Sequence, residues 1–570
     1  MNKRKGIVLV VSLVVLAIML VLTGVYFSSL LGEKRAADTE KFNFQSLDLA
    51  EAGANQAVAE LRKRVRTDLN NALRNETRSS VLVAYVAGNN SIGLLRDYAF
   101  TAGNNQFVIA GNLATLAVAP ISLNSGVQGN YSTTITIQGN GNPTNPRPDV
   151  YVFPYKYYID ATGAVTKSFP AVQKSVRLGN GSFTITVRRD NFAKFALFTA
   201  HHKTPSGTTV WFTANTNFTG PVSTNDRLSF ALNPSAGFTE EVTQHKETAR
   251  YYNNNDSVLL DADYNSYIDP NTGQEVIVDL PSFAKGFERG YEIVNLESSV
   301  SQADLKKEAL GTFSEPGSSG IYIPNDGTTV TGGVFIKSNR GDIGVAMSVD
   351  GSGNAVYTLT RGSTDTTVMT VNYATRQTSV TTGGSTVTYS GLPDGTKEEG
   401  VLIYANNDIS SFSGTVQKDS SVTVSSEKDI VITNHVQYQN YNAGPPINAT
   451  GYNNVLGVLA WGGNVRIGST APSNLNVHAV VMAPHGVFTV DDYDRGSSRG
   501  LVNLLGGAIT DFYGPFGTFG GNTPTGYGRN FVYDARMLAG MTPPYFPYLS
   551  NFTSSDDGGL DNVLTWQDKG

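Results

Sequence analysis

The stretch 261–275 (DADYNSYIDPNTGQE) has the residue types and the spacing of a metal-binding loop. Asp261, Asp263, Asn265 and Asp269 occupy positions 1, 3, 5 and 9 of a calcium-loop pattern, in which alternating oxygen donors wrap a hard cation. Two positions depart from the pattern, because serine replaces the usual glycine at position 6 and threonine replaces the bidentate glutamate at position 12. The stretch therefore predicts calcium as the one candidate cofactor, with an ordinary Asx-rich turn as the alternative.

No other group of residues has the spacing of a catalytic or metal site. The six histidines form no H-E-x-x-H or other zinc spacing, and the absence of cysteine excludes disulfides, thiolate metal sites and cysteine nucleophiles. No nucleophile elbow, Walker loop or dinucleotide fingerprint stands in a suitable context. His201 and His202 follow a strand-like segment, so we expect their side chains to point to opposite faces. The sequence predicts no enzyme.

Acidic and aromatic clusters offer two further surfaces. The acidic run at 491–494 is typical of a solvated loop, although convergent carboxylates on a β-structure would also suit a polysaccharide-cleaving enzyme. Tyrosines mixed with Asn and Gln at 251–256, 435–444 and 545–552 suit stacking on a surface glycan or contact with a protein ligand. Ordinary exposed strands carry the same mixture.

Charge is distributed unevenly along the chain of 570 residues. Residues 1–78 carry a net charge of +4 and the remainder −10, which together give −6. A body that binds nucleic acid usually has a basic face, so nucleic acid is not an expected partner. Glycine is abundant, at 59 residues, and charged residues make up only 16% of the chain.

The elements that must carry these surfaces begin with an uncharged segment at residues 7–31. This run of 25 residues would span about 38 Å as a helix, enough to cross a hydrocarbon core of about 30 Å. Lys3, Arg4 and Lys5 precede it, whereas charges of both signs follow it. The positive-inside rule therefore predicts a single-pass protein with a cytoplasmic N-terminus and an outward-facing body.

The helix is expected to continue beyond the bilayer to about residue 73, since no proline occurs before Pro120. Steps of three and four residues predict one apolar stripe that docks on a globular body. The residues of this stripe are Phe44, Leu47, Ala50, Ala54, Ala57, Val58, Leu61, Val65, Leu69 and Ala72. The charges at 60–68 then form a solvated face, which leaves a lipid-binding patch at 62–66 as a weaker alternative.

A basic leader that ends in glycine, an apolar segment and LAEAGANQAVAEL at 49–61 resemble type IV pilin-like proteins. The resemblance is strongest to PilX-like minor pilins and to the K-type pseudopilins of type II secretion. It implies that prepilin peptidase cuts between Gly6 and Ile7, and that other pilin-like subunits and the lipid bilayer are partners. Most pilins carry glutamate at the fifth mature position, where this chain has Val11. K-type tip subunits also lack it, so the resemblance implies a tip or initiating subunit, or else an uncleaved anchor outside any filament.

The rest of the chain reads as β-structure. Segments between residues 79 and 194 are rich in β-branched and aromatic residues and predict an antiparallel, pilin-like sheet. Four later segments repeat a polar corner followed by Ile or Val at 409, 430, 465 and 487, with spacings of 21, 35 and 22. Such spacing predicts the coils of a right-handed parallel β-helix, with an ordinary antiparallel sandwich as the alternative.

The predicted fold class is α+β and mainly β. A helix is expected at 302–310, with Ser301 and Asp304 as a capping box and Gly311 as its end. Blocks over much of 195–550, such as VLGVLAWGGNVRIG and MTPPYFPY, resemble an uncharacterised bacterial β-rich family often fused to a PilX-like N-terminus. The predicted parts are a leader at 1–6, a helix at 7–78, a sheet at 79–194, a head at 195–550 with an insertion at 240–311, and a flexible tail at 551–570.

Three functions follow as expectations. The first is a non-enzymatic minor pilin or pseudopilin of a type IV pilus or type II secretion-like filament, in the bacterial inner membrane with a periplasmic or extracellular body. The second is a membrane-anchored adhesin or envelope scaffold outside any filament. The third, more remote, is a β-helix enzyme that acts on polysaccharides.

Overall fold

Strands make up 45% of the protein and helices 21%, with a long N-terminal apolar helix and antiparallel sheets, as the composition predicts. The computed structural model describes residues 3–76, 78–100, 108–123, 129–147, 150–166, 172–213, 216–231, 236–253, 256–269, 271–278, 280–296, 301–439, 441, 453–518, 524–562 and 565–568. The chain divides into two compact units. Unit 1 comprises Met1–Arg189 and Asn551–Gly570, and unit 2 comprises Asp190–Ser550, close to the predicted boundaries.

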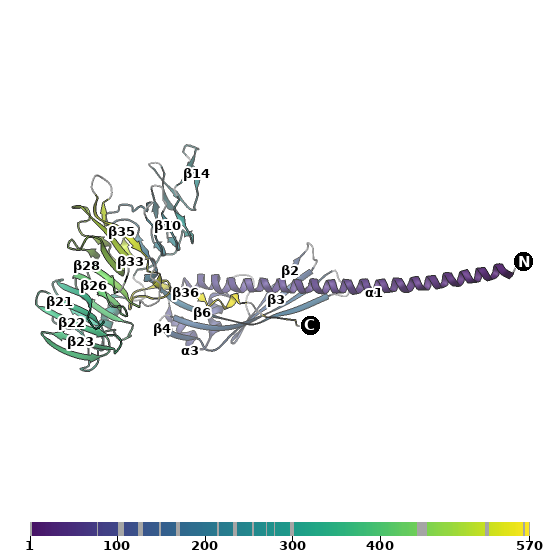
Figure 1. Cartoon of the computed structure of the whole chain (residues 1–570), viewed down its shortest axis with the longest axis horizontal. Helices are drawn as coiled ribbons and strands as arrows, with labels where there is room; N and C mark the ends of the chain where they lie inside the picture. The colour runs from purple at the N-terminus through teal and green to yellow at the C-terminus, as the bar shows by residue number, and fades with distance from the viewer. Residues whose placement is uncertain are drawn as a thin grey trace. The chain divides into compact units, whose positions relative to one another are not determined.

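The first element of unit 1 is a single helical rod. It consists of α1 (Lys3–Arg62), a π-helical segment (Lys63–Asp68) and α2 (Leu69–Leu73), which confirms the predicted helix over 7–73 (Figure 1). The absence of proline leaves the backbone hydrogen bonds uninterrupted. The π-helical turn has no counterpart in the sequence pattern.

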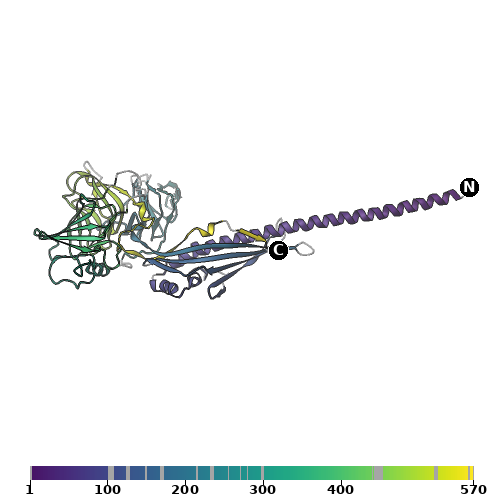
Figure 2. The same cartoon turned by 60° about the horizontal axis from the view of Figure 1, so that its bottom comes forward.

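The outer half of the rod packs on the sheet of unit 1 through one stripe (Figure 2). Six of the ten predicted stripe residues are buried: Ala50, Ala54, Ala57, Leu61, Val65 and Leu69. Leu47 and Val58 are partly buried against the same core. Phe44 is 61% exposed, so the prediction is wrong at that position. Phe42, two residues earlier, packs instead against the cluster formed by Leu49, Tyr131 and Val165.

Two short helices follow the rod: α3 (Ser79–Ala87) and α4 (Ser91–Tyr98). They occupy the start of the region 79–194, which the sequence predicts to be sheet. The sheet then runs in the order β1-β2-β3-β5-β6-β36, and its neighbours from β1 to β6 are antiparallel. The strands are β1 (Val108–Ala110), β2 (Leu113–Leu123), β3 (Gly129–Gly139), β5 (Val150–Val165), β6 (Val172–Asn191) and β36 (Tyr548–Asp556), with β4 (Thr144–Arg147) beside β5.

The C-terminal segment belongs to this sheet, so the predicted flexible tail at 551–570 is wrong. After β36 the chain forms a short 3₁₀ turn (Gly559–Asp561) and β37 (Thr565–Asp568), which pairs antiparallel with β6. Phe552 and Leu560 are buried in the core that the long helix shares. Acidic composition suggested solvation, but these two apolar side chains hold the segment down.

Unit 2 is organised around parallel ladders of strands (Figure 1). The longer ladder runs β19-β25-β27-β29-β31-β33-β7-β8-β11-β17. Its strands are β19 (Val334–Lys337), β25 (Val401–Ala405), β27 (Ser421–Ser426), β29 (Val455–Ala460), β31 (Leu475–Ala483), β33 (Ser498–Phe512), β7 (Leu197–His201), β8 (Val222–Thr224), β11 (Val242–Gln244) and β17 (Phe287–Glu288). Because β11 and β17 join the ladder, the predicted insertion at 240–311 is wrong for these strands.

A second parallel ladder tests the predicted repeat directly. It comprises β20 (Ile343–Val349), β26 (Ile409–Val416), β28 (Ile430–Tyr438), β30 (Val465–Ile467) and β32 (Phe488–Val490). Ile409 pairs with Ile430, and Ile430 with Val465, as the spacing predicts, whereas Val465 pairs with Phe488 rather than Val487. The strands are parallel, as coils require and as a purely antiparallel sandwich does not allow.

Polar side chains at the corners bind successive layers together. Asp408 accepts the backbone N–H of Asp429 at 3.0 Å, and Asp429 accepts that of Asn464 at 2.8 Å. Asn464 in turn accepts the N–H of Val487 at 3.0 Å. The polar residue at each predicted corner therefore satisfies a backbone donor of the next layer, which explains why Asp and Asn recur there.

Residues 541–548 (MTPPYFPY) form a strap over one ladder. The side chain of Asn191 donates to the Phe546 carbonyl at 2.9 Å, and the Thr423 hydroxyl donates to the Pro544 carbonyl. A Cβ at Gly457 would stand 2.8 Å from the Phe546 ring, so only glycine allows the strap to approach this closely.

The remaining elements of unit 2 lie outside the two parallel ladders. An antiparallel meander continues from β20 through β21 (Ala355–Arg361), β22 (Asp365–Asn372), β23 (Gln377–Thr382) and β24 (Ser385–Ser390). The predicted helix is α5 (Gln302–Leu310), and its Ser301/Asp304 capping box is confirmed. Short strands complete the unit: β9 (Ser229–Phe230), β10 (Gly237–Phe238), β12 (Ala249–Asn253), β13 (Asp256–Leu260), β14 (Ser266–Ile268), β15 (Glu275–Ile277), β16 (Ser282–Phe283), β18 (Gly320–Tyr322), β34 (Gly517–Thr518) and β35 (Thr525–Val532).

Candidate functional site

The inner half of α1 is an uncovered apolar surface. Every large apolar side chain from Ile7 to Leu31 is between 41% and 68% exposed. The helix Ile7–Leu73 is long and apolar enough to cross a membrane. Exposed patches of this size are unusual on soluble proteins and mark a surface that lipid or another apolar partner covers.

The predicted processing residues lie at the start of this helix. The backbone of Lys3, Arg4, Lys5 and Gly6 is helical, and Ile7 is 65% exposed. The side chains of residues 3–6 lie outside the described part of the structure, so processing at Gly6 and Ile7 stays a prediction.

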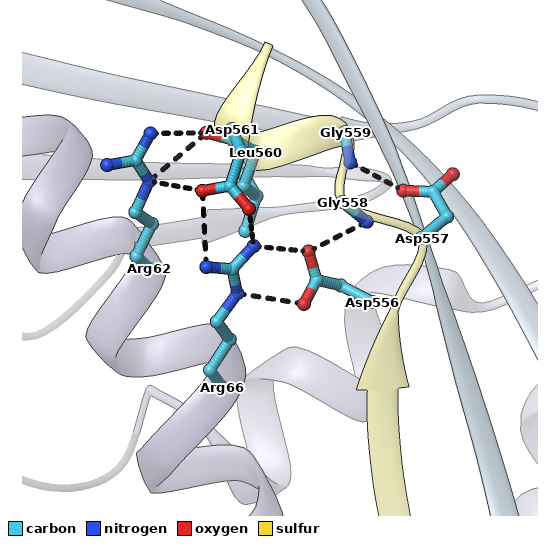
Figure 3. Close-up of polar contacts among 8 residues, drawn as sticks. All are labelled: Arg62, Arg66, Asp556, Asp557, Gly558, Gly559, Leu560 and Asp561. Atoms are coloured by element: carbon cyan, nitrogen blue, oxygen red, sulfur yellow. Dashed lines mark hydrogen bonds and ion pairs between the residues drawn. The ribbon is translucent and has the colours of Figure 1, made fainter.

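The outer half of the rod carries a cluster that joins it to the C-terminal segment, which we call the C-terminal latch: Arg62, Arg66, Asp556, Leu560 and Asp561 (Figure 3). Arg62 donates to the Leu560 carbonyl from Nε at 3.1 Å and from Nη2 at 2.9 Å. Arg66 forms a fork on Asp556, with Nε–Oδ1 and Nη2–Oδ2 distances of 2.8 Å each. Arg66 Nη2 also donates to Asp561 Oδ2 at 2.6 Å. Bidentate pairs of this kind fix geometry as well as charge.

Local structure positions each partner of the latch. Arg62 ends α1 and Arg66 lies four residues later within the π-helical segment, so both side chains reach the same C-terminal segment. Arg64 instead pairs with Glu60 at 2.9 Å and Asp68 at 3.2 Å. On the other side Gly558 adopts a left-handed φ of 79°, which turns the chain between Asp556 and the short 3₁₀ turn. The predicted solvated face at 60–68 is therefore wrong for Arg64, which is 6% exposed, whereas Arg62 and Arg66 stay partly solvated while they bind the C-terminal segment.

The latch is electrostatically matched. Hydrogen bonds to Asp556 and Asp561 raise the pKa of Arg66 above its ordinary value. The hydrogen bond from Arg66 lowers the pKa of Asp561 below 3.8. A depressed carboxyl pKa stabilises the closed latch at pH values above the ordinary pKa, and this contribution is lost as the pH falls through the lowered value. Acid should therefore weaken the latch.

We expect Arg66→Gln to loosen the C-terminal segment. Loss of both ion pairs to carboxylates should increase the amide hydrogen-exchange rate of residues 553–562 about fivefold at neutral pH. The effect is modest because both pairs are partly solvated. The matched control is Lys63→Gln, which removes the same charge from an exposed position on the same turn. Hydrogen-exchange mass spectrometry of the full chain measures both. Equal exchange rates of residues 553–562 in the two variants would show that Arg66 does not hold the C-terminal segment against the helix.

A second tie holds the same segment at Glu76, which is 5% exposed. Its carboxylate accepts from the Arg78 guanidinium at 2.8 and 2.9 Å and from the Tyr98 hydroxyl at 2.5 Å. The Arg78 hydrogen bonds, together with that from Tyr98, lower the pKa of Glu76 to about 2 despite the opposing effect of burial. The Glu76 carbonyl accepts the Phe552 N–H at 3.3 Å, so this ordered corner adjoins a buried residue of the C-terminal segment.

Three of the predicted calcium residues, Asp261, Asp263 and Asn265, are exposed and precede β14, and Asp269 lies in the turn between β14 and β15. Asp263 binds the Arg289 guanidinium at 2.6 Å, and Asp269 accepts the Asn271 N–H at 2.8 Å, as an Asx turn does. No three His, Asp or Glu side chains gather to hold a metal ion anywhere in the described residues. The geometry favours the Asx-turn alternative at Asp269. Calcium binding by Asp261, Asp263, Asn265 and Asp269 stays an untested prediction.

The histidines and the acidic loop also occupy structural positions. His201 is exposed and pairs with Asp511 at 2.7 Å, whereas His202 is buried, so the predicted opposite orientation is confirmed. Burial lowers the pKa of His202 to about 4. Within the acidic run, Asp491 binds Arg466 at 2.8 Å.

The C-terminal latch is the side-chain cluster that sequence reasoning missed, because its partners are separated by about 490 residues. Its only local signal was a pair of arginines four apart. Comparison with known proteins adds one match: a family described as "Domain of unknown function (DUF4900)" matches residues 150–246, a minor part of the chain running from β5 to β11. No curated protein and no solved structure matches the chain.

Proposed function

We propose that this protein is a non-enzymatic, pilin-like or pseudopilin-like component of the bacterial envelope. The observation that carries the proposal is the division of one uninterrupted helix into two halves. Its inner half exposes every large apolar side chain, and its outer half is buried against a sheet. A helix of this kind serves as an anchor in lipid and as the spine of a folded unit at once. Such a spine can also pack against neighbouring helices in a filament.

Membrane insertion sets the proposed topology. Residues 7–31 cross the inner membrane once, with Lys3–Lys5 on the cytoplasmic side. The part of unit 1 that follows residue 31, and unit 2, are then periplasmic or extracellular. The only charged residues before the apolar run 7–31 are basic, whereas acidic and basic residues occur together immediately after it. The partners proposed are the bilayer, prepilin peptidase and other pilin-like subunits.

For unit 2 we propose a right-handed parallel β-helix as the architecture behind the two ladders. In-register parallel pairing of Ile409, Ile430 and Val465 supports it, as do the corner side chains that bond one layer to the next. Such a body provides a large exposed surface, and we propose no catalytic role for it. A surface glycan or a protein ligand is the kind of partner this surface could contact.

The proposed position in a filament is the tip or the start. Val11, in the uncovered half of α1, stands where the pilin resemblance expects a glutamate. An apolar residue there has no carboxylate to pair with the amine of a neighbouring subunit. The same substitution also suits a membrane-anchored adhesin or scaffold that joins no filament, which is the second candidate.

Cleavage of the leader tests the proposal. We expect the mature protein isolated from its native membrane to begin at Ile7, with an N-methylated amine, and Gly6→Ala to remain uncut. Glycine at the cleavage point lets the peptidase approach the backbone, and a methyl group obstructs it. Intact-mass and N-terminal peptide mass spectrometry measure both.

The matched control is Gly32→Ala, since a Cβ at Gly32 meets no neighbouring atom within 4 Å and should leave processing unchanged. If wild type and Gly6→Ala both retain residues 1–6, the protein is not processed as a pilin. The anchored adhesin or scaffold then becomes the better account.

A further inference from the structure

The outermost strand of the meander in unit 2 has one free edge. β24 pairs with β23 through the register Thr378–Tyr389 to Thr382–Ser385. On its other side, only its last residue is engaged: Ser390 donates to the Thr328 carbonyl and accepts from the Val330 N–H, at 2.9 Å each. Among the described residues no strand register includes the outer edge of 385–389, and β25, the next strand in the chain, pairs with β19 and β27 instead.

The backbone groups on this edge can be assigned by parity. In an antiparallel pair, N–H and C=O groups of alternate residues point to opposite sides of a strand. Since Ser390 bonds outward, Thr388 and Thr386 also direct their N–H and C=O groups outward. Val387 lies between them, with its polar backbone directed toward β23.

The free edge has none of the features that usually prevent strands from associating. Residues 385–389 (STVTY) contain no charged side chain and no proline, and their register with β23 is regular. Residues 385–388 are exposed, and the Val387 side chain is 50% exposed. Its cross-strand neighbour Val380 is only partly buried.

We propose that this edge is a homodimer contact, in which β24 of a second copy pairs antiparallel with β24 about a twofold axis through Val387. The central three residues of the free stretch, 386–388 (TVT), are symmetric about Val387, whereas Ser385 and Tyr389 at its ends differ. A twofold axis pairs a strand with itself, so a sequence that reads the same in both directions is matched on both sides. A second copy also fits a stretch that contains no charge to repel its own image.

The pairing satisfies the exposed groups on both copies. Thr386 faces Thr388 of the second copy and the reverse, which provides about four backbone hydrogen bonds. Threonine hydroxyl contacts across the meander, Thr381 with Thr386 and Ser379 with Thr388 at 2.8 Å each, would continue across the new pair. The two Val387 side chains then cover each other and extend the Val380 stripe.

Cysteine cross-linking tests the register directly, because the protein has no cysteine of its own. Val387 occupies a non-hydrogen-bonded position, where facing Cα atoms are about 4.5 Å apart, within the range a disulfide bridges. Full-length Val387→Cys in detergent micelles should form a disulfide-linked dimer under mild oxidation. The disulfide should form at least about tenfold faster than in the control variant Thr366→Cys. Thr366 is exposed but lies on the inner strand β22, and both variants keep the same apolar helix in the micelle.

A charge at the axis gives the second measurement. Val387→Lys should weaken the dimer about tenfold or more in sedimentation equilibrium, because like charges directly opposite on paired strands repel. Thr366→Lys should leave association unchanged. The proposal is overturned if wild type shows no dimer beyond what Val387→Lys shows, or if both cysteine variants cross-link at the same rate.

Discussion

Arg536→Met should lower the free energy of unfolding of unit 2 by about 3–5 kcal/mol, the range typical of breaking a buried ion pair. Arg536 and Asp534 are 2% and 1% exposed, and Arg536 Nη2 lies 2.6 Å from Asp534 Oδ2. Burial alone would lower the pKa of Arg536, but the hydrogen bonds to Asp534 raise it above its ordinary value. Methionine fills much of the arginine stem and leaves the Asp534 carboxylate buried without its cation.

A second variant separates lost charge from lost packing. Asp534→Asn should rescue much of the loss in the Arg536→Met background, because a neutral amide can still cap the following turn as Asp534 does. Urea unfolding can be followed by the fluorescence of Trp211 and Trp461, which lie in unit 2, in a Trp566→Phe background that removes the one tryptophan of unit 1. Equal stability of the single and double variants would mean that packing, not charge, dominates.

The second large effect is expected at the contact between helix and sheet in unit 1. Gly163→Val should destabilise the docked half of the helix by about 3 kcal/mol, at the upper end for an overpacked core. A Cβ at Gly163 would overlap the Ser46 carbonyl oxygen and stand 2.6 Å from the Ala50 nitrogen. Both are backbone atoms of the helix, so they cannot move aside as a side chain can.

Amide exchange across residues 46–73 measures this loss, because those hydrogen bonds open when the helix leaves the sheet. Gly179→Val on β6 of the same sheet is the control. Its nearest side-chain atom to a new Cβ is 3.8 Å away, an ordinary contact. Unchanged exchange in Gly163→Val would show that the helix is free to shift on the sheet.

The periodic parts of the protein could be predicted because their signal is local. An uncharged run without proline specifies the helix, and steps of three and four locate the buried Ala50, Ala54, Ala57 and Leu61. Corner residues set the register of Ile409, Ile430 and Val465, since each strand of the parallel ladder repeats a polar corner residue followed by an apolar one. The one-residue error at Val487 arises because an apolar residue occupies the corner itself. Val487 donates its N–H to Asn464, as Asn464 does to Asp429, and Phe488 takes the paired position.

The latch could not be predicted by the same reasoning. Arg66 reads as a surface charge, and Asp556 and Asp561 read as part of a polar tail, until the segment after unit 2 returns to pair with β6. The ladder order shows the same limit, because β7, the first strand of unit 2, lies beside β33 and not at an end of the stack. No local sequence pattern specifies which distant strand will pair with the edge of a given strand.

The sequence by itself determined the elements and their exposed or buried faces: an apolar anchor continuous with a docking helix, a mainly β body and repeated corners. Those properties depend on the period and polarity of neighbouring residues, which are written in the chain. The tertiary structure alone decided the pairings across hundreds of residues, including the latch, the strap at 541–548 and the free edge of β24. Such contacts depend on loop closure and on which complementary surfaces remain uncovered, and both are fixed only when the whole chain has folded.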